Sequence, residues 1–173
     1  MRKRIELFDS KFSGLAWKFQ VSPLSCGNHE HYEEYIRLIA LSDRAIGMGT
    51  THVLLVEENG TEDIAGFVTL KASSIVNESD GTLYGTPAIE ITELAVSGKH
   101  ERNGYGSELL DYAISLALNV NENIAVKHIT LCSDPKSVGF YEKYGFQKLS
   151  HSLVIPSEGW NENCVPMYLT LPK

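Results

Sequence analysis

The sequence is poor in cysteine and lacks the cysteine patterns that mark a metal site. Its three cysteines, Cys26, Cys132 and Cys164, lie far apart in the chain. No CxxC pair and no cluster of cysteine and histidine has the spacing of a zinc site. We therefore expect no metal cofactor, and we expect reduced thiols, as in an intracellular protein.

Long apolar runs and an excess of basic residues are also missing. No stretch approaches the roughly 18 consecutive apolar residues that cross a membrane. The basic first residues are followed at once by Glu6 and Asp9, which makes a poor signal peptide. The formal net charge of −7, without a basic stripe, argues against an extended nucleic-acid interface. These features predict a cytoplasmic protein without membrane contact.

The size and periodicity of the chain predict one folded domain. The sequence has 173 residues, of which 43% are hydrophobic, so a single domain over residues 1–173 can bury a core. Apolar and polar residues alternate over 15–21, which predicts a strand. Apolar residues recur at helical spacing over 29–44, and this predicts a helix with Asn28 as its N-cap.

The rest of the chain alternates between strands and helices. Strands at 51–57 and 64–75 form a predicted hairpin around Asn59-Gly60, with a connection longer than two residues. Then follow a polar loop at 77–86, a strand at 88–96, a helix at 104–118, a strand at 126–132, a helix at 134–144 and closing strands at 146–155 and 164–171. This order predicts a mixed α/β sheet.

A glycine-rich segment follows the strand at 88–96 and opens the next helix. Its residues are Arg102, Asn103, Gly104, Tyr105, Gly106 and Ser107. The first N–H groups of a helix have no partner within it, and glycine lets an anion approach the backbone. A Rossmann fingerprint needs a third glycine where Leu109 stands, and a Walker A motif needs Gly-Lys-Ser/Thr, which is absent. The segment therefore predicts either a pyrophosphate site of a type other than these two or a tight strand-to-helix turn.

The sequence resembles the GNAT N-acetyltransferase superfamily. Four stretches carry the resemblance in the family's order: Glu90–Val96, His100–Leu110, Ile129–Ser133 and Asp134–Phe146, the last with Phe140-Tyr141 and Gly145-Phe146. The resemblance implies a single-domain, mixed, mostly antiparallel, twisted sheet that is flanked by helices. It also implies that this sheet is splayed at its centre, between strands 88–96 and 127–133.

The resemblance further implies acetyl-CoA as the acyl donor. The pantetheine arm would pair with the backbone of Leu94, Ala95 and Val96, and the pyrophosphate would bind the N–H groups of Arg102 to Ser107. Glu101 departs from the family pattern, which usually has Gln or Arg there, so Arg102 is expected to supply the positive charge. Asp134 stands where Asn is frequent; it is expected to cap the last helix and to contact the pantetheine.

The implied reaction is direct attack of a primary amine on the acetyl thioester. The amine must lose a proton, because the pKa of an alkyl ammonium is about 10. By resemblance to the family's Phe-Tyr pair, Tyr141 is expected to be the general acid for the leaving thiolate. Glu90 is the preferred general base, with Glu93 and water as alternatives. The two glutamates are expected on opposite faces of a regular strand.

The acceptor amine stays open at this point. A small polyamine, an amino acid, an antibiotic or a peptide N-terminus would suit. The six histidines form no visible cluster. Ser25-Cys26-Gly27 and Asn121–Val126 resemble the branch of toxins that acetylate aminoacyl-tRNA. The net charge of −7 departs from the basic face which that branch implies. A non-catalytic CoA-binding module on the same fold is the other alternative, and a homodimer is left open.

Overall fold

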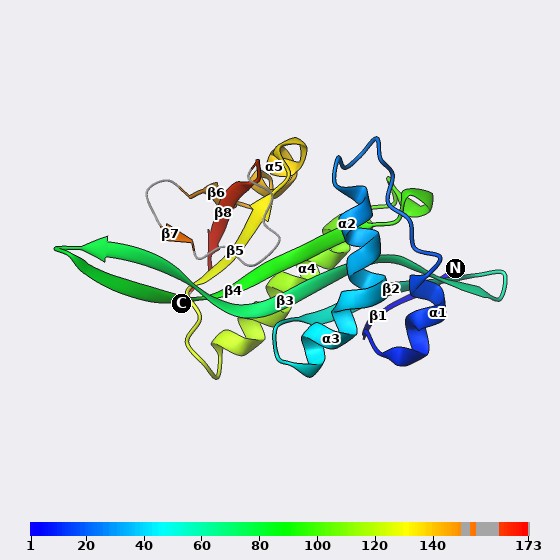
Figure 1. Cartoon of the computed structure of the whole chain (residues 1–173), viewed down its shortest axis with the longest axis horizontal. Helices are drawn as coiled ribbons and strands as arrows, with labels where there is room; N and C mark the ends of the chain where they lie inside the picture. Colours follow the sequence, from blue (N-terminus) through cyan, green and yellow to red (C-terminus); the bar gives the residue numbers. More distant parts are fainter. Residues whose placement is uncertain (150–152, 155–162, 173) are drawn as a thin grey trace. The chain divides into compact units, whose positions relative to one another are not determined.

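The computed structural model describes residues 1–149, 153–154 and 163–172. The chain divides into two units, one of Met1–Leu70 with Glu93–Ala113 and one of Lys71–Thr92 with Ile114–Lys173. Three elements contribute residues to both units: β3 (Thr61–Ser79), β4 (Thr82–Val96) and α4 (Tyr105–Asn121) (Figure 1). The prediction that residues 1–173 form one domain stays a prediction.

The strands form a mixed sheet, as predicted. Its strand order is β1-β2-β3-β4-β5-β8-β6, and β7 pairs with β3 outside this path. Among the registers of the described strands, only β4 and β5 are parallel, and they pair from Ala88↔His128 to Ile91↔Leu131. Strand β4 continues beyond this register to Val96, as a splayed sheet requires. The remaining strands are β1 (Arg2–Leu7), β2 (Thr50–Glu58), β5 (His128–Ser133), β6 (Gln147–Lys148), β7 (Leu153–Val154) and β8 (Val165–Thr170).

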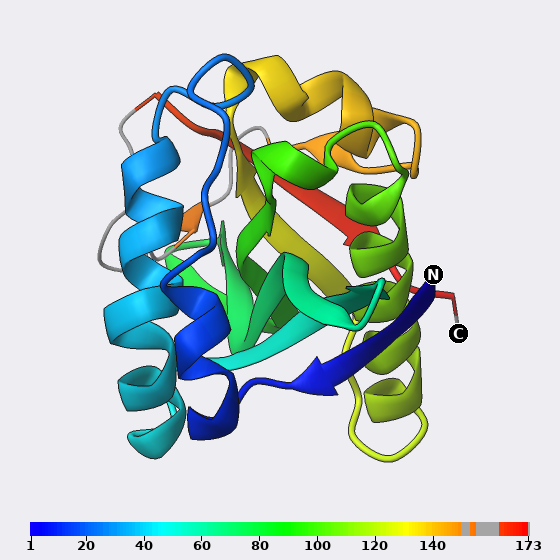
Figure 2. The ribbon, with the colours of Figure 1, turned by 90° about the vertical axis from the view of Figure 1, so that its right-hand side faces the viewer.

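In the first unit, the strands separate the N-terminal helices from the first half of α4 (Figure 2). The side chains of β2 alternate between these two sides, because successive residues of a strand point in opposite directions. Val53 and Leu55 join the core beneath the helices, whereas the His52 ring lies 5.1 Å from the ring of Tyr112 in α4. The helices on the first side are η1 (Ser10–Phe12), α1 (Ser13–Ala16), α2 (His29–Glu34), the π-helical turn η2 (Tyr35–Ile39) and α3 (Ala40–Ala45).

The strand predicted at 15–21 is wrong, because this segment begins in helix α1. Phe12, Ala16 and Phe19 are buried, which is a helical spacing, whereas Trp17 is 61% exposed. The strand prediction failed because it treated the exposed Trp17 as a core residue. The first strand is instead β1, an edge strand. Its charged residues give no alternation of apolar and polar residues from which a strand could be predicted.

Two hairpin turns also differ from the prediction. Glu58 pairs with Thr61, so the connection is two residues long and not longer. Asn59 and Gly60 both have positive φ, 51° and 76°, as the two-residue turn that matches strand twist requires. The predicted polar loop at 77–86 is a second such hairpin, which turns at Asp80-Gly81 (Figure 1). Its polar residues suggested a loop because this ribbon is largely exposed.

Most other elements agree with the prediction. Helices α2 to α3 fill the predicted helix at 29–44, and Asn28 occupies its N-cap position without a side-chain hydrogen bond. The 3-10 turns η3 (Gly98–His100) and η4 (Pro135–Ser137) precede α4 and α5 (Val138–Glu142). The helix predicted at 104–118 is α4, and the helix predicted at 134–144 is η4 with α5. The strands predicted at 126–132 and 164–171 are β5 and β8. Strands β6 and β7 lie in the strand predicted at 146–155, of which residues 150–152 and 155 are outside the described residues.

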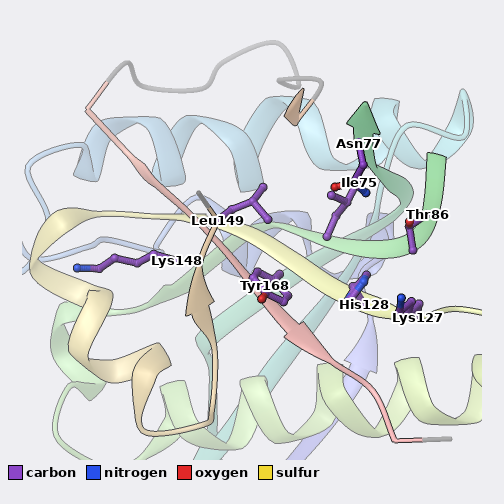
Figure 3. Close-up of a pocket in the computed structure, with 8 residues that line it drawn as sticks. All are labelled: Ile75, Asn77, Thr86, Lys127, His128, Lys148, Leu149 and Tyr168. Carbon is purple, nitrogen blue, oxygen red and sulfur yellow. The ribbon is translucent and has the colours of Figure 1, made fainter. Parts of the chain in front are cut away.

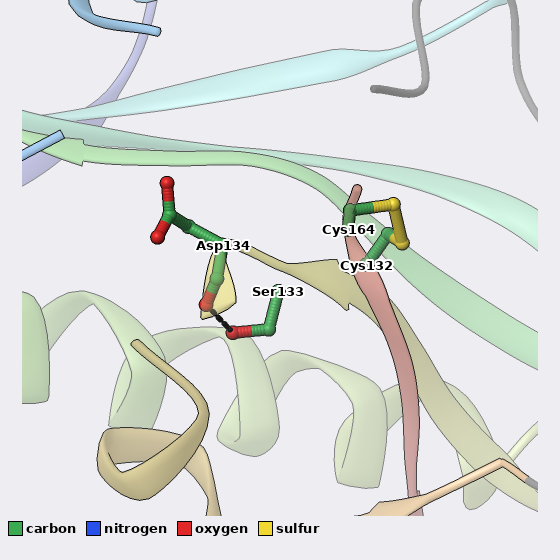
Figure 4. Close-up of a disulfide and its surroundings, with 4 residues drawn as sticks. All are labelled: Cys132, Ser133, Asp134 and Cys164. Atoms are coloured by element: carbon green, nitrogen blue, oxygen red, sulfur yellow. Dashed lines mark hydrogen bonds between the residues drawn. A yellow bond between two sulfur atoms is a disulfide. The ribbon is translucent and has the colours of Figure 1, made fainter. Parts of the chain in front are cut away.

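The expectation of reduced cysteines is wrong for two of the three. Cys132 and Cys164 form a disulfide with a Cα–Cα distance of 5.4 Å (Figure 4), whereas Cys26 is free. The antiparallel register of β5 and β8 pairs Cys132 with Pro166, which brings Cys164 beside Cys132. The sequence separation of 32 residues gave no sign of this pairing.

Two further observations concern membranes and metals. No helix in the described part of the chain is long and apolar enough to cross a membrane. The described residues also contain no group of three or more His, Cys, Asp or Glu side chains that could hold a metal ion.

Candidate active site

The predicted phosphate loop lies in the first unit, at the start of α4. Arg102 and Gly104 have positive φ angles of 63° and 77°, so two of these three successive residues lie in the left-handed region of the backbone. The side chain of Asn103 holds this bend by donating to the carbonyl oxygens of His100 and Glu101, at 3.0 and 3.2 Å. Helical bonding begins when the Glu108 N–H donates to the Gly104 carbonyl at 3.1 Å. The N–H groups of Tyr105, Gly106 and Ser107 therefore precede the first helical bond and can bind an anion.

The end of β4 leads into this loop through two backbone hydrogen bonds. The Ser97 N–H donates to the Ala65 carbonyl, and the Gly98 N–H donates to the Gln20 carbonyl, both at 2.8 Å. Ala95 is buried, and Leu94 and Val96 are half-buried. The predicted pantetheine segment and the predicted pyrophosphate loop are therefore joined by an anchored connection of few residues.

Tyr141 lies in α5 of the second unit and is buried. Its ring packs edge-on against Phe140 and Phe146, at centroid distances of 5.0 and 5.7 Å. Burial in these aromatic surroundings raises the pKa of the phenol, because desolvation disfavours the phenolate. Tyr141 therefore keeps its proton at neutral pH, as a general acid must.

Asp134 caps the turn that leads to Tyr141. Its Oδ1 accepts a hydrogen bond from the Lys136 N–H at 2.8 Å, so the predicted capping role is confirmed. The neighbouring Ser133 hydroxyl donates to the Asp134 carbonyl at 2.8 Å (Figure 4). These two bonds fix the exit of the chain from β5 toward α5.

Glu90 is a buried residue of β4, with 1% of its surface exposed. Its Oε2 accepts a hydrogen bond from the Ser73 hydroxyl at 3.1 Å and lies 3.4 Å from the Lys71 amino group. Glu90 is therefore not a surface carboxylate at the end of its strand. Glu90 is paired in register with Thr130 of β5, and Thr130 is paired with Tyr168 of β8. Since directly opposed residues share a face, these three side chains form one row across the sheet.

Glu93 lies in the first unit and has a partner that sequence reasoning missed. His31 Nε2 is 2.9 Å from Oε1 and 3.0 Å from Oε2 of Glu93. The hydrogen bond with Glu93 raises the pKa of His31, although partial burial opposes this shift. His31 precedes Tyr35 by four residues, so the two share a helix face, and their rings are 6.3 Å apart. This spacing could have indicated from the sequence that His31 faces the sheet.

A cavity of about 260 Å³ lies in the second unit. Lys127 and His128, at the start of β5, line it together with Tyr168 of β8 (Figure 3). No candidate of the sequence analysis falls in this cavity. Residues 127 and 128 belong to the predicted strand at 126–132, but their basic character was not connected with a site.

Comparisons with known proteins also indicate an acetyltransferase. A model described as the acetyltransferase (GNAT) family matches residues 14–146, and a comparison with curated protein sequences gives no match. A tyrosine mutant of KacT superposes with a TM-score of 0.75 at 13% identity, over 98% of this chain and 95% of that one. A mutant AtaT toxin bound to the C-terminus of the antitoxin AtaR and acetyl-CoA gives 0.71 at 14% identity, over 97% and 92%.

A third solved structure is AtaT complexed with acetyl-methionyl-tRNAfMet. Its TM-score is 0.73 at 15% identity, and the match covers 95% of this chain and 94% of that one. At such identities the likeness shows the fold. The family model, in contrast, spans most of the chain. The chain therefore belongs to the acetyltransferase (GNAT) family and is, as its sequence predicted, an acetyl-CoA-dependent N-acetyltransferase.

Proposed function

We propose that this chain transfers the acetyl group of acetyl-CoA to a primary amine by direct attack, with Tyr141 as the general acid. The buried phenol of Tyr141 carries the proposal. Its hydroxyl makes no hydrogen bond with any described residue, and burial keeps it protonated. Such a group can give its proton to the CoA thiolate as the thioester breaks.

The donor side of the proposal rests on the loop before α4. The N–H groups of Arg102 to Ser107 would bind the pyrophosphate, and the Arg102 side chain, which is exposed, would add positive charge. The backbone of Leu94, Ala95 and Val96 would pair with the pantetheine amides. Asp134 would fix the turn that follows β5, since its side chain already caps that turn.

We assign the general base to Glu90. Its burial and its row with Thr130 and Tyr168 support this role, because a carboxylate on a strand face can meet an amine that approaches the sheet. Lys71, 3.4 Å away, compensates the charge of the buried carboxylate. Glu90 would take one proton from the ammonium, and the neutral amine would then attack the acetyl carbonyl. As the C–S bond breaks, the thiolate would take the proton of Tyr141, and the nitrogen would release its second proton to solvent to give the amide.

A second candidate acceptor is the α-amino group of an aminoacyl-tRNA. The structures of AtaT favour it, one of them with acetyl-methionyl-tRNAfMet, because the chain covers nearly the whole of that protein's length. The net charge of −7 gives this chain no general affinity for RNA. This reading therefore needs a local basic site.

The test is thiol release from acetyl-CoA over a panel of amines that includes aminoacyl-tRNA. The enzyme releases CoA only when an acceptor is present, and the acetylated product identifies that acceptor. A non-catalytic CoA-binding module on the same fold would be stabilised by acetyl-CoA but would release no thiol. The absence of both stabilisation and thiol release would contradict the proposal.

A further inference from the structure

The cavity at the start of β5 is basic, although the chain as a whole is acidic. Eight residues of the described part of the chain line it, and none of these eight is acidic. Lys127 is exposed and His128 is buried at 9% exposure. Neither Lys127 nor Lys148 makes an ion pair with a described residue. The described part of the lining thus carries positive charge that no described carboxylate pairs with, in a chain of net charge −7.

The side chains of the cavity differ in where they point. Lys127 and His128 lie together at one end, whereas the Lys148 amino group points away from both (Figure 3). His128 Nδ1 is 3.2 Å from the Thr170 hydroxyl, so a donation from Thr170 leaves Nε2 as the N–H donor. The His128 ring also packs edge-on against Tyr168, at 5.5 Å. Lys127, His128 and the hydroxyl of Thr86 therefore offer donors to an anion.

The cavity adjoins the row that contains Glu90. His128 precedes Thr130 by two residues, and residues two apart on a strand share a face about 7 Å from each other. Tyr168 belongs both to the cavity lining and to the row. An acceptor whose amine lies at Glu90 therefore reaches Lys127 and His128 with a group a few bonds farther along.

We infer that this cavity binds a phosphate group of the acceptor, with Lys127 and His128 as the phosphate-binding residues. The inference rests on the proposed function and names its substrate class, an amine that carries a phosphate ester. Burial and, to a lesser extent, the nearby charge of Lys127 lower the pKa of His128. A bound phosphate would oppose this effect. Both a small phosphorylated amine and the nucleotide part of an aminoacyl-tRNA present this chemistry.

The binding test uses inorganic phosphate and the full chain, followed by the NMR signals of the His128 imidazole. We expect saturable shifts in the wild type, at least fivefold weaker binding in Lys127→Gln and less than twofold weaker binding in Lys148→Gln. Lys148→Gln is the matched control, since it removes the same charge from the same lining. The absence of saturation, or equal weakening in both variants, would overturn the inference.

The acceptor test compares matched amines in the thiol-release assay. The pairs are O-phosphoserine with serine, and 3′-aminoacyl-adenosine with and without a 5′-phosphate, which separate the two sources of phosphate. We expect kcat/KM to be at least tenfold higher for the phosphorylated member of one pair, and we expect Lys127→Gln to abolish this advantage. An equal kcat/KM within both pairs would overturn the inference. Phosphate binding without any thiol release would instead contradict the proposed function alone.

Discussion

Glu93 holds His31 through both of its carboxylate oxygens, at 2.9 and 3.0 Å from Nε2. The pair links α2 to β4 within the first unit. The Glu93 side chain is 11% exposed and that of His31 is 31% exposed, so water screens the pair only in part. The contact explains why the pKa of His31 is raised.

This pair predicts a stability that depends on pH. Because the folded pKa of His31 lies above the ordinary value of 6.5, the pair's stabilisation is fully present below pH 6.5. It is lost as the pH rises through the raised pKa. We expect the difference in free energy of unfolding between the wild type and Glu93→Gln to shrink with rising pH, measured by urea unfolding. A difference that stays constant from pH 6 to pH 9 would contradict the protonated pair.

The Tyr141 hydroxyl predicts a loss of rate without a loss of fold. Tyr141→Phe keeps the ring contacts with Phe140 and Phe146 and removes only the donor. We expect kcat to fall on the order of 100-fold or more, the usual worth of a placed proton donor, with little change in the affinity for acetyl-CoA. The control is Tyr144→Phe, in the turn that follows α5, where the Tyr144 ring lies 5.5 Å from the Phe140 ring. Full activity of Tyr141→Phe would exclude the general-acid role.

Glu90 predicts a pH-dependent loss of activity. Glu90→Gln keeps an oxygen for the Ser73 hydroxyl but cannot take a proton from the amine. We expect kcat/KM at neutral pH to fall on the order of 100-fold. The loss should shrink as the pH approaches the amine pKa of about 10, where the free amine no longer needs a base. If Glu93→Gln loses more activity than Glu90→Gln across this pH range, Glu90 is not the base.

The sequence predicted the helices and strands from β4 to α5 well, because motif and periodicity agree there. The N-terminal part was harder. The exposed Trp17 fitted the alternating pattern of a strand, although its segment is helical. The charged edge strand β1 has no alternation of apolar and polar residues from which it could be predicted. The exposed ribbon of β3 and β4 had loop composition, since neither of its faces needs apolar residues.

The site was predictable where one segment of sequence forms it. The loop at 102–107 and the cap of Asp134 are local, and their residues could be read from the chain. The partners of Glu90 and Glu93 are 17 and 62 residues away and depend on strand register and helix docking. The Cys132–Cys164 pair depends on register in the same way.

The disulfide predicts a stability that depends on reductant. Closing a loop of 32 residues removes chain entropy worth about 3–4 kcal/mol from the unfolded state. We expect Cys132→Ser to lower the free energy of unfolding by about this amount without reductant, and we expect reductant to bring the wild type down to the variant. Cys26→Ser changes no disulfide and is the control. Equal stability of the wild type and Cys132→Ser without reductant would show that the bond does not form.

We expect the loop before α4 to bind acetyl-CoA through its backbone. Calorimetric titration of acetyl-CoA onto the wild type and onto Gly104→Ala measures this binding. Gly104 has a φ of 77° and nothing within 4 Å of an added Cβ, so alanine strains the loop without a clash. We expect saturable one-to-one binding by the wild type and at least fivefold weaker binding by Gly104→Ala. No binding to the wild type, or equal affinities of the two proteins, would contradict it.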